Sequence, residues 1–164
     1  MQEFRGKNIE SGVARNIPDY DLAASILQSS PIAVFALNTD HKVIFWNKAL
    51  EELTGIKAAD MIGTGEYWKV FYSDKRDLMA DLIIEGMAEG ADKANQHLAK
   101  FKKSVLLAEA YEAVDFFPLL GKGGKWLRVT ASLIRDAAGR IYGALETLED
   151  ITERMLAEEL YITL

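Results

Sequence analysis

The last third of the chain alternates apolar and polar residues over three stretches, a period-two pattern that is typical of β-strands. The pattern predicts strands at residues 111–117, 126–134 and 141–148. The glycine-rich residues 121–124 and the segment 136–139 lie between these strands and predict tight turns. Because the last strand runs straight into a charged segment with helical character, we expect the sheet to connect directly to a helix.

Two shorter β-rich runs lie nearer the N-terminus, at Ile32–Leu37 and Val43–Trp46. Turn-forming residues separate them, so they predict a hairpin. Asn47 follows the second run and is placed to cap a helix at residues 48–54, which Gly55 is expected to end.

Apolar residues at helical spacing predict the remaining elements. They indicate a helix at residues 19–28, a short one at 58–62, and two in the middle of the chain, at 78–87 and 94–105. The full order is two strands, several helices, three strands and a helix. This order is typical of an α+β domain in which helices cover an antiparallel sheet.

Length and composition narrow the class of protein. The 164 residues suit one domain, expected at 19–150, with a flexible lead-in at 1–18 and the start of a linker helix at 151–164. A net charge of −6 without a basic stripe argues against nucleic-acid binding. No apolar run is long enough to span a bilayer and the polar N-terminus is no signal peptide, so we expect a cytoplasmic protein.

Signals of catalysis are lacking in the sequence. The absence of cysteine removes thiolate nucleophiles and cysteine-ligated metals, and we find neither a paired base and nucleophile nor metal-ligand spacing. The segment Gly121-Lys122-Gly123-Gly124-Lys125 has neither the spacing nor the hydroxyl residue of a phosphate loop, and it precedes a strand. We therefore do not expect an enzyme.

Four motifs carry a resemblance to a known family. They are the strand and turn at 30–40, the strand and asparagine-capped helix at 43–55, the turn at 134–141, and Asp150-Ile151-Thr152-Glu153-Arg154 at the exit of the sheet. In this order they resemble the PAS domain, over roughly residues 20 to 158. The resemblance implies a five-stranded antiparallel sheet with helices packed on one face, an N-terminal flanking helix and a C-terminal signalling helix.

The middle of the chain departs from a minimal PAS domain, because about 35 residues of expected helix precede Tyr111. This resembles a histidine-kinase-associated subtype with an enlarged central helical segment. The resemblance implies a sensory module of a two-component system, a homodimer that passes its state to a histidine kinase or similar effector. The leading hypothesis is that a small ligand binds between sheet and helices and moves the helix that starts at Ile151. The alternative is a ligand-free domain that only pairs subunits.

The resemblance also implies an internal cavity at the helical face of the sheet. The candidate lining residues are Trp68, Tyr72, His97, Phe101, Phe117, Leu127, Val129, Glu146 and Leu148. The aromatic members are expected to pack mostly in the core.

Glu146 has two interpretations. Strand alternation places it on the same face as Ala144 and Leu148, and the register of the family points that face at the cavity. A carboxylate there needs a hydrogen-bond or charge partner, which a ligand amine could supply. The alternative, which we favour by a narrow margin, is a shift or bulge that lets Glu146 reach solvent at an edge.

The cofactor is not identified by the sequence. His97 borders the second helical stripe, in the region where haem-binding PAS domains place an axial histidine, so a haem gas sensor is a third hypothesis. A lone histidine beside an apolar stripe is more often a boundary residue, and His41, in a hairpin turn, is expected to be solvated. Without cysteine a flavin adduct is impossible, and nothing in the strands favours non-covalent flavin.

The outer face of the sheet and its exit supply the remaining candidates. The row Trp126, Arg128 and Thr130 alternates with the aliphatic residues of its strand and suits a partner surface, to which Tyr20 and Leu27 of the first helix would contribute. That helix could also cover the row within one chain, and both interpretations could hold at once. Asp150 and Thr152 are the candidates for signal relay, and Met155 and Leu160 would begin a coiled coil.

Overall fold

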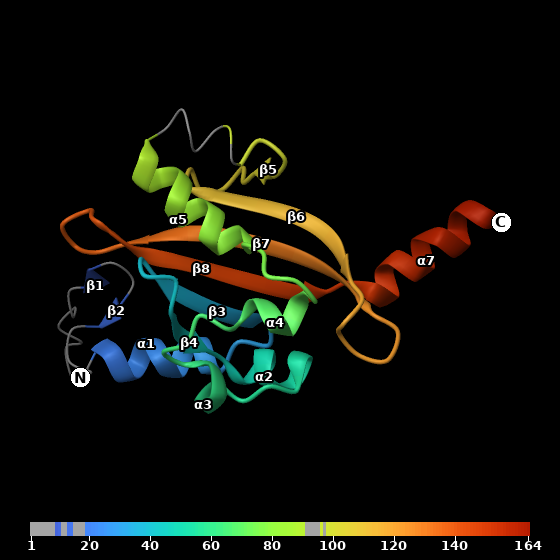
Figure 1. Ribbon diagram of the computed structural model, residues 1–164, viewed down its shortest axis with the longest axis horizontal. Helices are drawn as coiled ribbons and strands as arrows, with labels where there is room; N and C mark the ends of the chain where they lie inside the picture. Colours follow the sequence, from blue (N-terminus) through green and yellow to red (C-terminus); the bar gives the residue numbers. More distant parts are fainter. Residues whose placement is uncertain (1–8, 11–12, 15–18, 91–95, 97) are drawn as a thin grey trace, which may run out of the picture.

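The computed structural model describes residues 9–10, 13–14, 19–90, 96 and 98–164, and its centre is a six-stranded antiparallel sheet (Figure 1). The strand order is β4-β3-β8-β7-β6-β5, so the last strand lies beside the first strand of the sheet. The strands are β3 (Ala33–Asn38), β4 (Val43–Trp46), β5 (Lys102–Lys103), β6 (Ala110–Phe117), β7 (Lys125–Arg135) and β8 (Ile141–Asp150).

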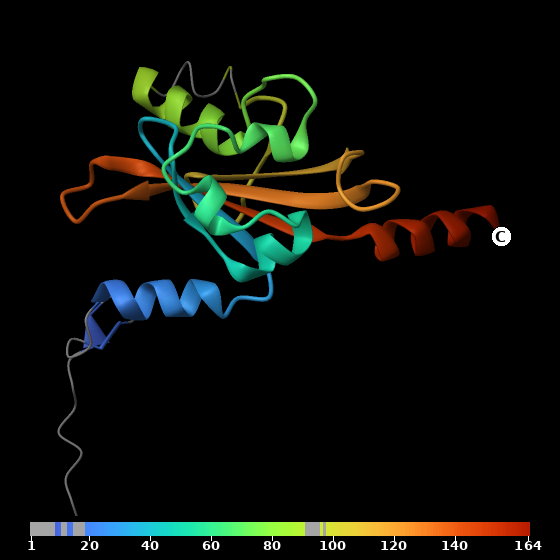
Figure 2. The same cartoon turned by 60° about the horizontal axis from the view of Figure 1, so that its bottom comes forward.

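Short helices and one longer helix gather on one face of the sheet, while the first helix lies on the opposite side (Figure 2). Helix α5 contacts β7, β8 and β3, so it lies over the centre of the sheet. The helices are α1 (Asp19–Gln28), α2 (Lys48–Thr54), α3 (Ala58–Met61), α4 (Trp68–Phe71), α5 (Met79–Glu89) and α7 (Thr152–Thr163). None of the helices in the described residues combines the length and apolar character needed to cross a membrane.

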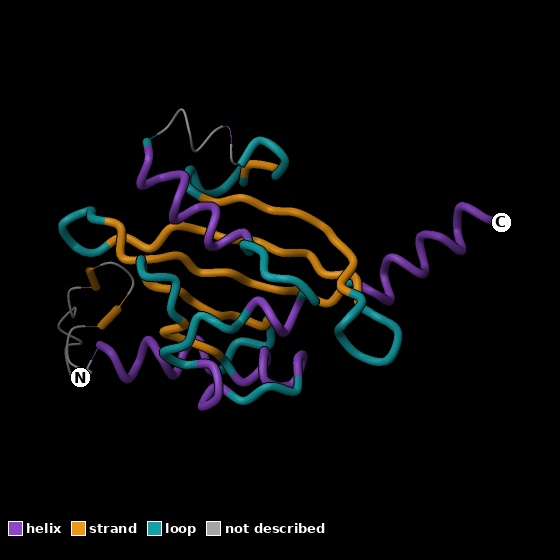
Figure 3. The backbone as a smooth tube through the Cα atoms, viewed as in Figure 1, coloured by secondary structure: helices purple, strands orange, loops and turns teal. Residues whose placement is uncertain are grey.

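The two predicted strand groups are confirmed, with small differences at their ends (Figure 3). The α+β class is also confirmed, but the sheet has six strands rather than five because β5 pairs with the edge of β6. The lead-in contains the short paired strands β1 (Ile9–Glu10) and β2 (Val13–Ala14), where we expected no regular structure.

The second predicted helix in the middle of the chain is wrong over residues 98–105, although Gln96 is helical. Residues 98–101 form turns, Lys102–Lys103 form β5, and Val105 is exposed in the loop that follows. Pairing with β6 satisfies backbone groups that a helix would have satisfied internally. Most of the segment 91–97, which includes Ala94 and His97, lies outside the described residues.

Asn47 joins three elements at the start of α2, as its predicted role as a cap requires. Its side chain is fully buried, and Oδ1 accepts hydrogen bonds from the amides of Val34 (3.0 Å) and Leu50 (2.9 Å). Its Nδ2 donates to the carbonyl oxygens of Leu27 (3.1 Å) and Ile32 (2.9 Å). The asparagine therefore fastens the end of α1 and the start of β3 to α2, which ends at Gly55 with a φ of 74°.

Candidate functional site

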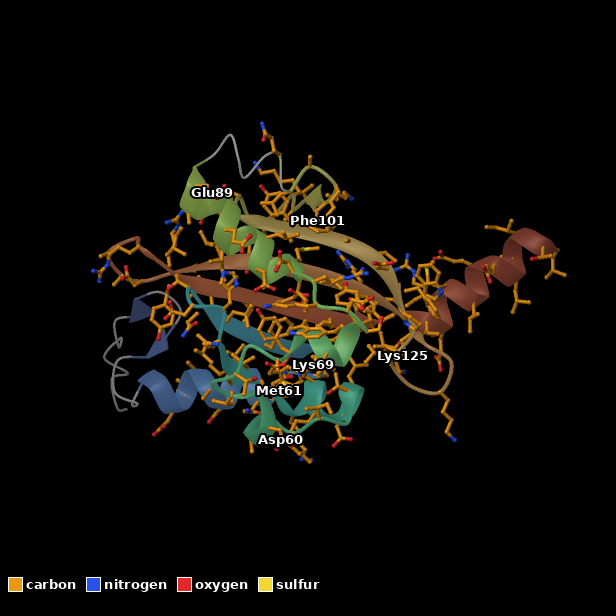
Figure 4. All side chains as sticks on the ribbon, in the orientation of Figure 1. Asp60, Met61, Lys69, Glu89, Phe101 and Lys125 are labelled. Carbon is orange, nitrogen blue, oxygen red and sulfur yellow. The ribbon has the colours of Figure 1, made fainter. Side chains whose placement is uncertain are left out.

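A pocket of about 400 Å³ lies between the inner face of β6, β7 and β8 and the segment that joins α4 to α5. Its volume falls in the range of small-molecule sites, roughly 300–1,000 Å³. Six of the predicted cavity residues line it: Tyr72, Phe101, Phe117, Val129, Glu146 and Leu148. Figure 4 shows Phe101 near β5 and the edge of β6.

Three predicted cavity residues do not belong to this pocket as described. Leu127 is fully buried in the core, and Trp68 is half-buried against it, near the surface hollow around His41. His97 lies outside the described residues. The pocket is thus lined by strand residues, by Tyr72 and residues 76–79 from the end of α4 to the start of α5, and by Lys100 and Phe101, rather than by the whole aromatic stretch.

Glu146 points inward and is 2% exposed, so the bulge that we favoured, which would bring it to solvent, is wrong. The strand keeps its register on both sides, where Glu146 lies opposite Phe35 on β3 and Ala131 on β7. Its Oε2 accepts a hydrogen bond of 2.8 Å from the amide of Ala80, in the first turn of α5. A free amide at a helix N-terminus is a natural donor to a carboxylate.

The environment of Glu146 favours its neutral form. Burial raises the pKa of Glu146 to about 8, against the opposing effect of the Ala80 hydrogen bond and with a smaller contribution from the nearby Asp81 carboxylate. Glu146 is therefore the buried ionisable group of the pocket, and it titrates close to physiological pH.

Asp81 forms a second buried acidic site near Glu146 that was not among the residues predicted from the sequence. It is 3% exposed and accepts hydrogen bonds from the Tyr67 hydroxyl (2.5 Å) and the Leu78 amide (2.8 Å). His41 Nδ1 lies 2.5 Å from the same carboxylate, and its side chain, expected to be solvated, is 32% exposed and pairs with this acid. Burial, followed by the hydrogen bond to Asp81, raises the pKa of Tyr67. The available signal was the position of Asp81 three residues after Leu78, where a side chain can bond back to the first amides of a helix.

The mouth of the pocket is charged and exposed, and the sequence analysis missed its members. Arg76, Asp77, Lys100 and Asp115 line it, two cations and two acids. The Arg76 guanidinium lies 4.4 Å from the centre of the Tyr72 ring, an arrangement that permits a cation–π contact. Strand alternation with Phe117 was a signal for Asp115, whereas nothing local marked Arg76 or Lys100.

The row on the outer face of β7 is largely uncovered, so the alternative in which α1 covers it within the chain is wrong. Helix α1 lies toward the β4 edge of the sheet instead, where the Leu27 carbonyl accepts from Asn47, the residue after β4 (Figure 1). Arg128 is exposed and pairs with Glu112 on β6, at 2.9 Å between Nη2 and Oε2. Trp126 is half-buried against Phe116, with ring centres 5.4 Å apart.

Three other residues were predicted to belong to this surface: Thr130, Leu27 and Tyr20. The hydroxyl of Thr130 hydrogen-bonds that of Thr147 on β8, while Leu27 is half-buried. The side chain of Tyr20 lies outside the described residues.

The exit of the sheet is held by a compact set of hydrogen bonds to the start of β7. The Ile151 amide donates to the Trp126 carbonyl (2.9 Å), and the Trp126 amide donates to the Thr152 hydroxyl oxygen (3.0 Å). Asp150 accepts from the amide and hydroxyl of Thr152, and its other oxygen lies 2.6 Å from Lys125 Nζ, which Figure 4 labels beside α7. Partial burial opposes ionisation of Asp150, but the bonds from Lys125 and Thr152 hold its pKa below the usual value.

Comparison with known proteins agrees with this architecture. A sequence model of the PAS fold matches residues 22–151. The chain is 22% identical to phytochrome B of Oryza sativa subsp. indica over 162 residues, which is 99% of this chain but 12% of that protein. Phytochrome B of Sorghum bicolor is 21% identical over the same length. The chain thus spans about an eighth of the curated relatives that it matches.

Solved structures show the same fold at low sequence identity. An RNA-binding Light-Oxygen-Voltage receptor has a TM-score of 0.62 at 19% identity, with 94% of this chain and 41% of that chain covered. The PAS domain of Bordetella pertussis BvgS has a TM-score of 0.52 at 16% identity, with 88% and 96% covered.

Proposed function

Because this chain belongs to the PAS family, we propose that it is a sensory signalling module that binds a small molecule in the pocket at Glu146 and relays the bound state through α7. The observation that carries the proposal is the position of one strand, β8. Glu146 and Leu148 of β8 line the pocket, and Asp150, two residues after Leu148, belongs to the exit junction. A displacement of β8 at the pocket is therefore close to the start of α7.

The relay requires a ligand that binds two arrangements of the sheet with different affinity. At the junction, α7 is held to β7 by the Ile151–Trp126 and Asp150–Lys125 contacts, which a second arrangement would have to change. Both contacts join β8 and its helix to the strand that pairs with β8 along most of its length. A ligand that shifts β8 against β7 would loosen or tighten these contacts and so reorient α7.

The output would reach a histidine kinase or a similar effector in a cytoplasmic homodimer. Helix α7 projects away from the sheet (Figure 1), and its apolar residues Leu156, Leu160, Tyr161 and Ile162 are exposed. Met155 near its start is half-buried. An exposed apolar stripe of this kind favours contact with a second helix.

Native mass spectrometry combined with hydrogen exchange tests this function. We expect the purified chain to retain a small molecule, or a metabolite panel to raise its melting temperature, and the bound form to exchange the Ile151 amide at a different rate. In Thr152→Val the binding should persist while the exchange response is lost, because the Trp126 amide loses its acceptor. Glu153→Gln, one residue further on and exposed, should retain both. Absence of any bound molecule together with absence of any thermal shift would overturn the proposal.

A pairing role is the second candidate function, and the outer face supports it. Val114 and Phe116 of β6 are exposed there, beside the half-buried Trp126 and the exposed Arg128. This candidate does not need a ligand. The exchange experiment separates the two, because a domain that only pairs subunits shows no response of Ile151 to a small molecule.

A further inference from the structure

We propose that the pocket selects a small organic molecule that presents a cationic N–H group, such as an amine, an amidine or a protonated nitrogen heterocycle, to the free carboxylate oxygen of Glu146. This inference rests on the proposed function, because it names the class of ligand for the same pocket.

The hydrogen bonding of the Glu146 carboxylate is incomplete. Its Oε2 accepts from the Ala80 amide, whereas its Oε1 has no partner among the described residues. No fully buried side-chain oxygen or nitrogen in the described part of the chain lacks a partner, so Oε1 keeps some contact with open space. The space that Glu146 borders is the pocket. The deep end of the pocket thus presents one unused acceptor on a side chain that is 2% exposed.

The sign of the charge at this end of the pocket also matters. On α5 the group that faces Glu146 is Asp81, also an acid, and the sheet neighbours Phe35 and Ala131 carry no charge. The other titratable groups that line the pocket are Tyr72, Arg76, Asp77, Lys100 and Asp115. Tyr67 and His41 contact Asp81 from the side away from this lining. Among the described groups of the lining, neither cation pairs with Glu146, and all four charged ones are exposed at the mouth.

The environment of Glu146 favours a cationic ligand. A buried carboxylate without a cation is costly to ionise, so a ligand that supplies a positive charge and an N–H donor stabilises it most. An anionic ligand would add negative charge near Asp81 and would oppose the ionisation of Glu146, so it gains nothing from the carboxylate. The aromatic rings of Tyr72, Phe101 and Phe117 line the same pocket and favour a flat or apolar body.

Proton linkage gives the inference a measurable signature. A cationic ligand binds the ionised form of Glu146, whereas the empty pocket holds the neutral form below a pKa of about 8. Affinity for a cation should therefore rise with pH, by up to about tenfold for each pH unit below this value, and level off above it.

The test uses three probes of one shape on the full chain: benzamidine, benzamide and benzoate, which are cationic, neutral and anionic. Binding is measured by calorimetry or by ligand-observed NMR between about pH 6 and pH 9, where benzamidine keeps its charge. We expect benzamidine to bind best and benzoate worst, with the rise in benzamidine affinity at higher pH. In Glu146→Gln the preference for benzamidine and its pH dependence should be lost, while benzamide still binds and so reports an intact pocket.

Glu149→Gln is the matched control, because it removes the same charge from an exposed position of the same strand outside the pocket and should leave the order of the probes unchanged. The inference is overturned if benzoate binds as well as benzamidine, if the preference survives in Glu146→Gln or is lost in Glu149→Gln, or if benzamidine does not bind at millimolar concentration. Failure of the two proposals is distinguishable. A retained acidic molecule that alters Ile151 exchange would leave the sensory function standing, whereas benzamidine binding without any exchange response would leave only the ligand class.

Discussion

Replacing Glu146 by glutamine removes one buried titration from the core while keeping the acceptor for the Ala80 amide. In the folded protein the pKa of Glu146 is raised from 4.5 to about 8. Between these values the folded chain holds a proton that the unfolded chain has released. The stability that depends on this proton is fully present below about pH 4.5 and is lost as the pH rises towards 8.

The size of the effect follows from the two pKa values. Each pH unit between them lowers the free energy of unfolding by about 1.4 kcal/mol, and the whole interval corresponds to an upper bound of roughly 5 kcal/mol. Glu146→Gln lacks this slope. The variant should match the original chain near pH 4.5 and exceed it by several kcal/mol at pH 8, which is a large share of the stability of a small domain.

Urea unfolding of both chains at about pH 5, 6, 7 and 8 measures the difference directly. Carboxylates with a lowered pKa, such as those of Glu109 and Asp136, lose their stabilising contribution only as the pH falls through the acid range, and they cancel between the two chains. Glu149→Gln, which removes an exposed carboxylate from the same strand, is the matched control and should not change the slope. Parallel stability curves for the original chain and Glu146→Gln would refute the reasoning.

Three further substitutions test other parts of the structure. Asn47→Ala should destabilise the chain by about 3–5 kcal/mol, because four backbone groups, two of them buried, lose their partner. Thermal unfolding measures this, and a loss no larger than that of Asn38→Ala, at the half-buried end of β3, would contradict it. Tyr67→Phe should cost about 1–3 kcal/mol in urea unfolding by removing a hydrogen bond to the buried Asp81, and a neutral effect would contradict that bond. Asp150→Asn should change stability by less than about 1 kcal/mol, because its pair with Lys125 is partly exposed, yet speed hydrogen exchange at Ile151; unchanged exchange would argue against a role in holding α7.

The parts of the fold that the sequence predicted correctly are those with a local cause. Strands β6, β7 and β8 carry their alternation and turn residues within about 40 consecutive positions. Asn47 and Gly55 mark both ends of α2 by capping and by a left-handed conformation, which are properties of single residues. Where the pattern of apolar residues and the residues that end an element lie in the same segment, the predicted element forms.

In the middle of the chain the local pattern predicts the wrong element. Leu98 is buried and Phe101 is half-buried, so two members of the predicted stripe do face the core. However, the backbone at Lys102–Lys103 pairs with Glu112 and Tyr111 of β6. The neighbouring strand supplies this pairing, and helical spacing within the segment contains no information about it.

For the candidate site, the sequence predicted which residues share a face of the sheet, but not which groups they contact. Alternation put Glu146 on the same side as Leu148, but the choice between core and edge depended on whether a distant group could satisfy a carboxylate. That group is the amide of Ala80, 66 residues earlier in the chain, which is free only because α5 begins at Met79. The other carboxylate oxygen of Glu146, Oε1, is the atom that we expect to bind a cationic ligand. The site is therefore formed by a contact between a strand and the start of a helix. The sequence contains both partners, but it does not indicate that they lie in contact.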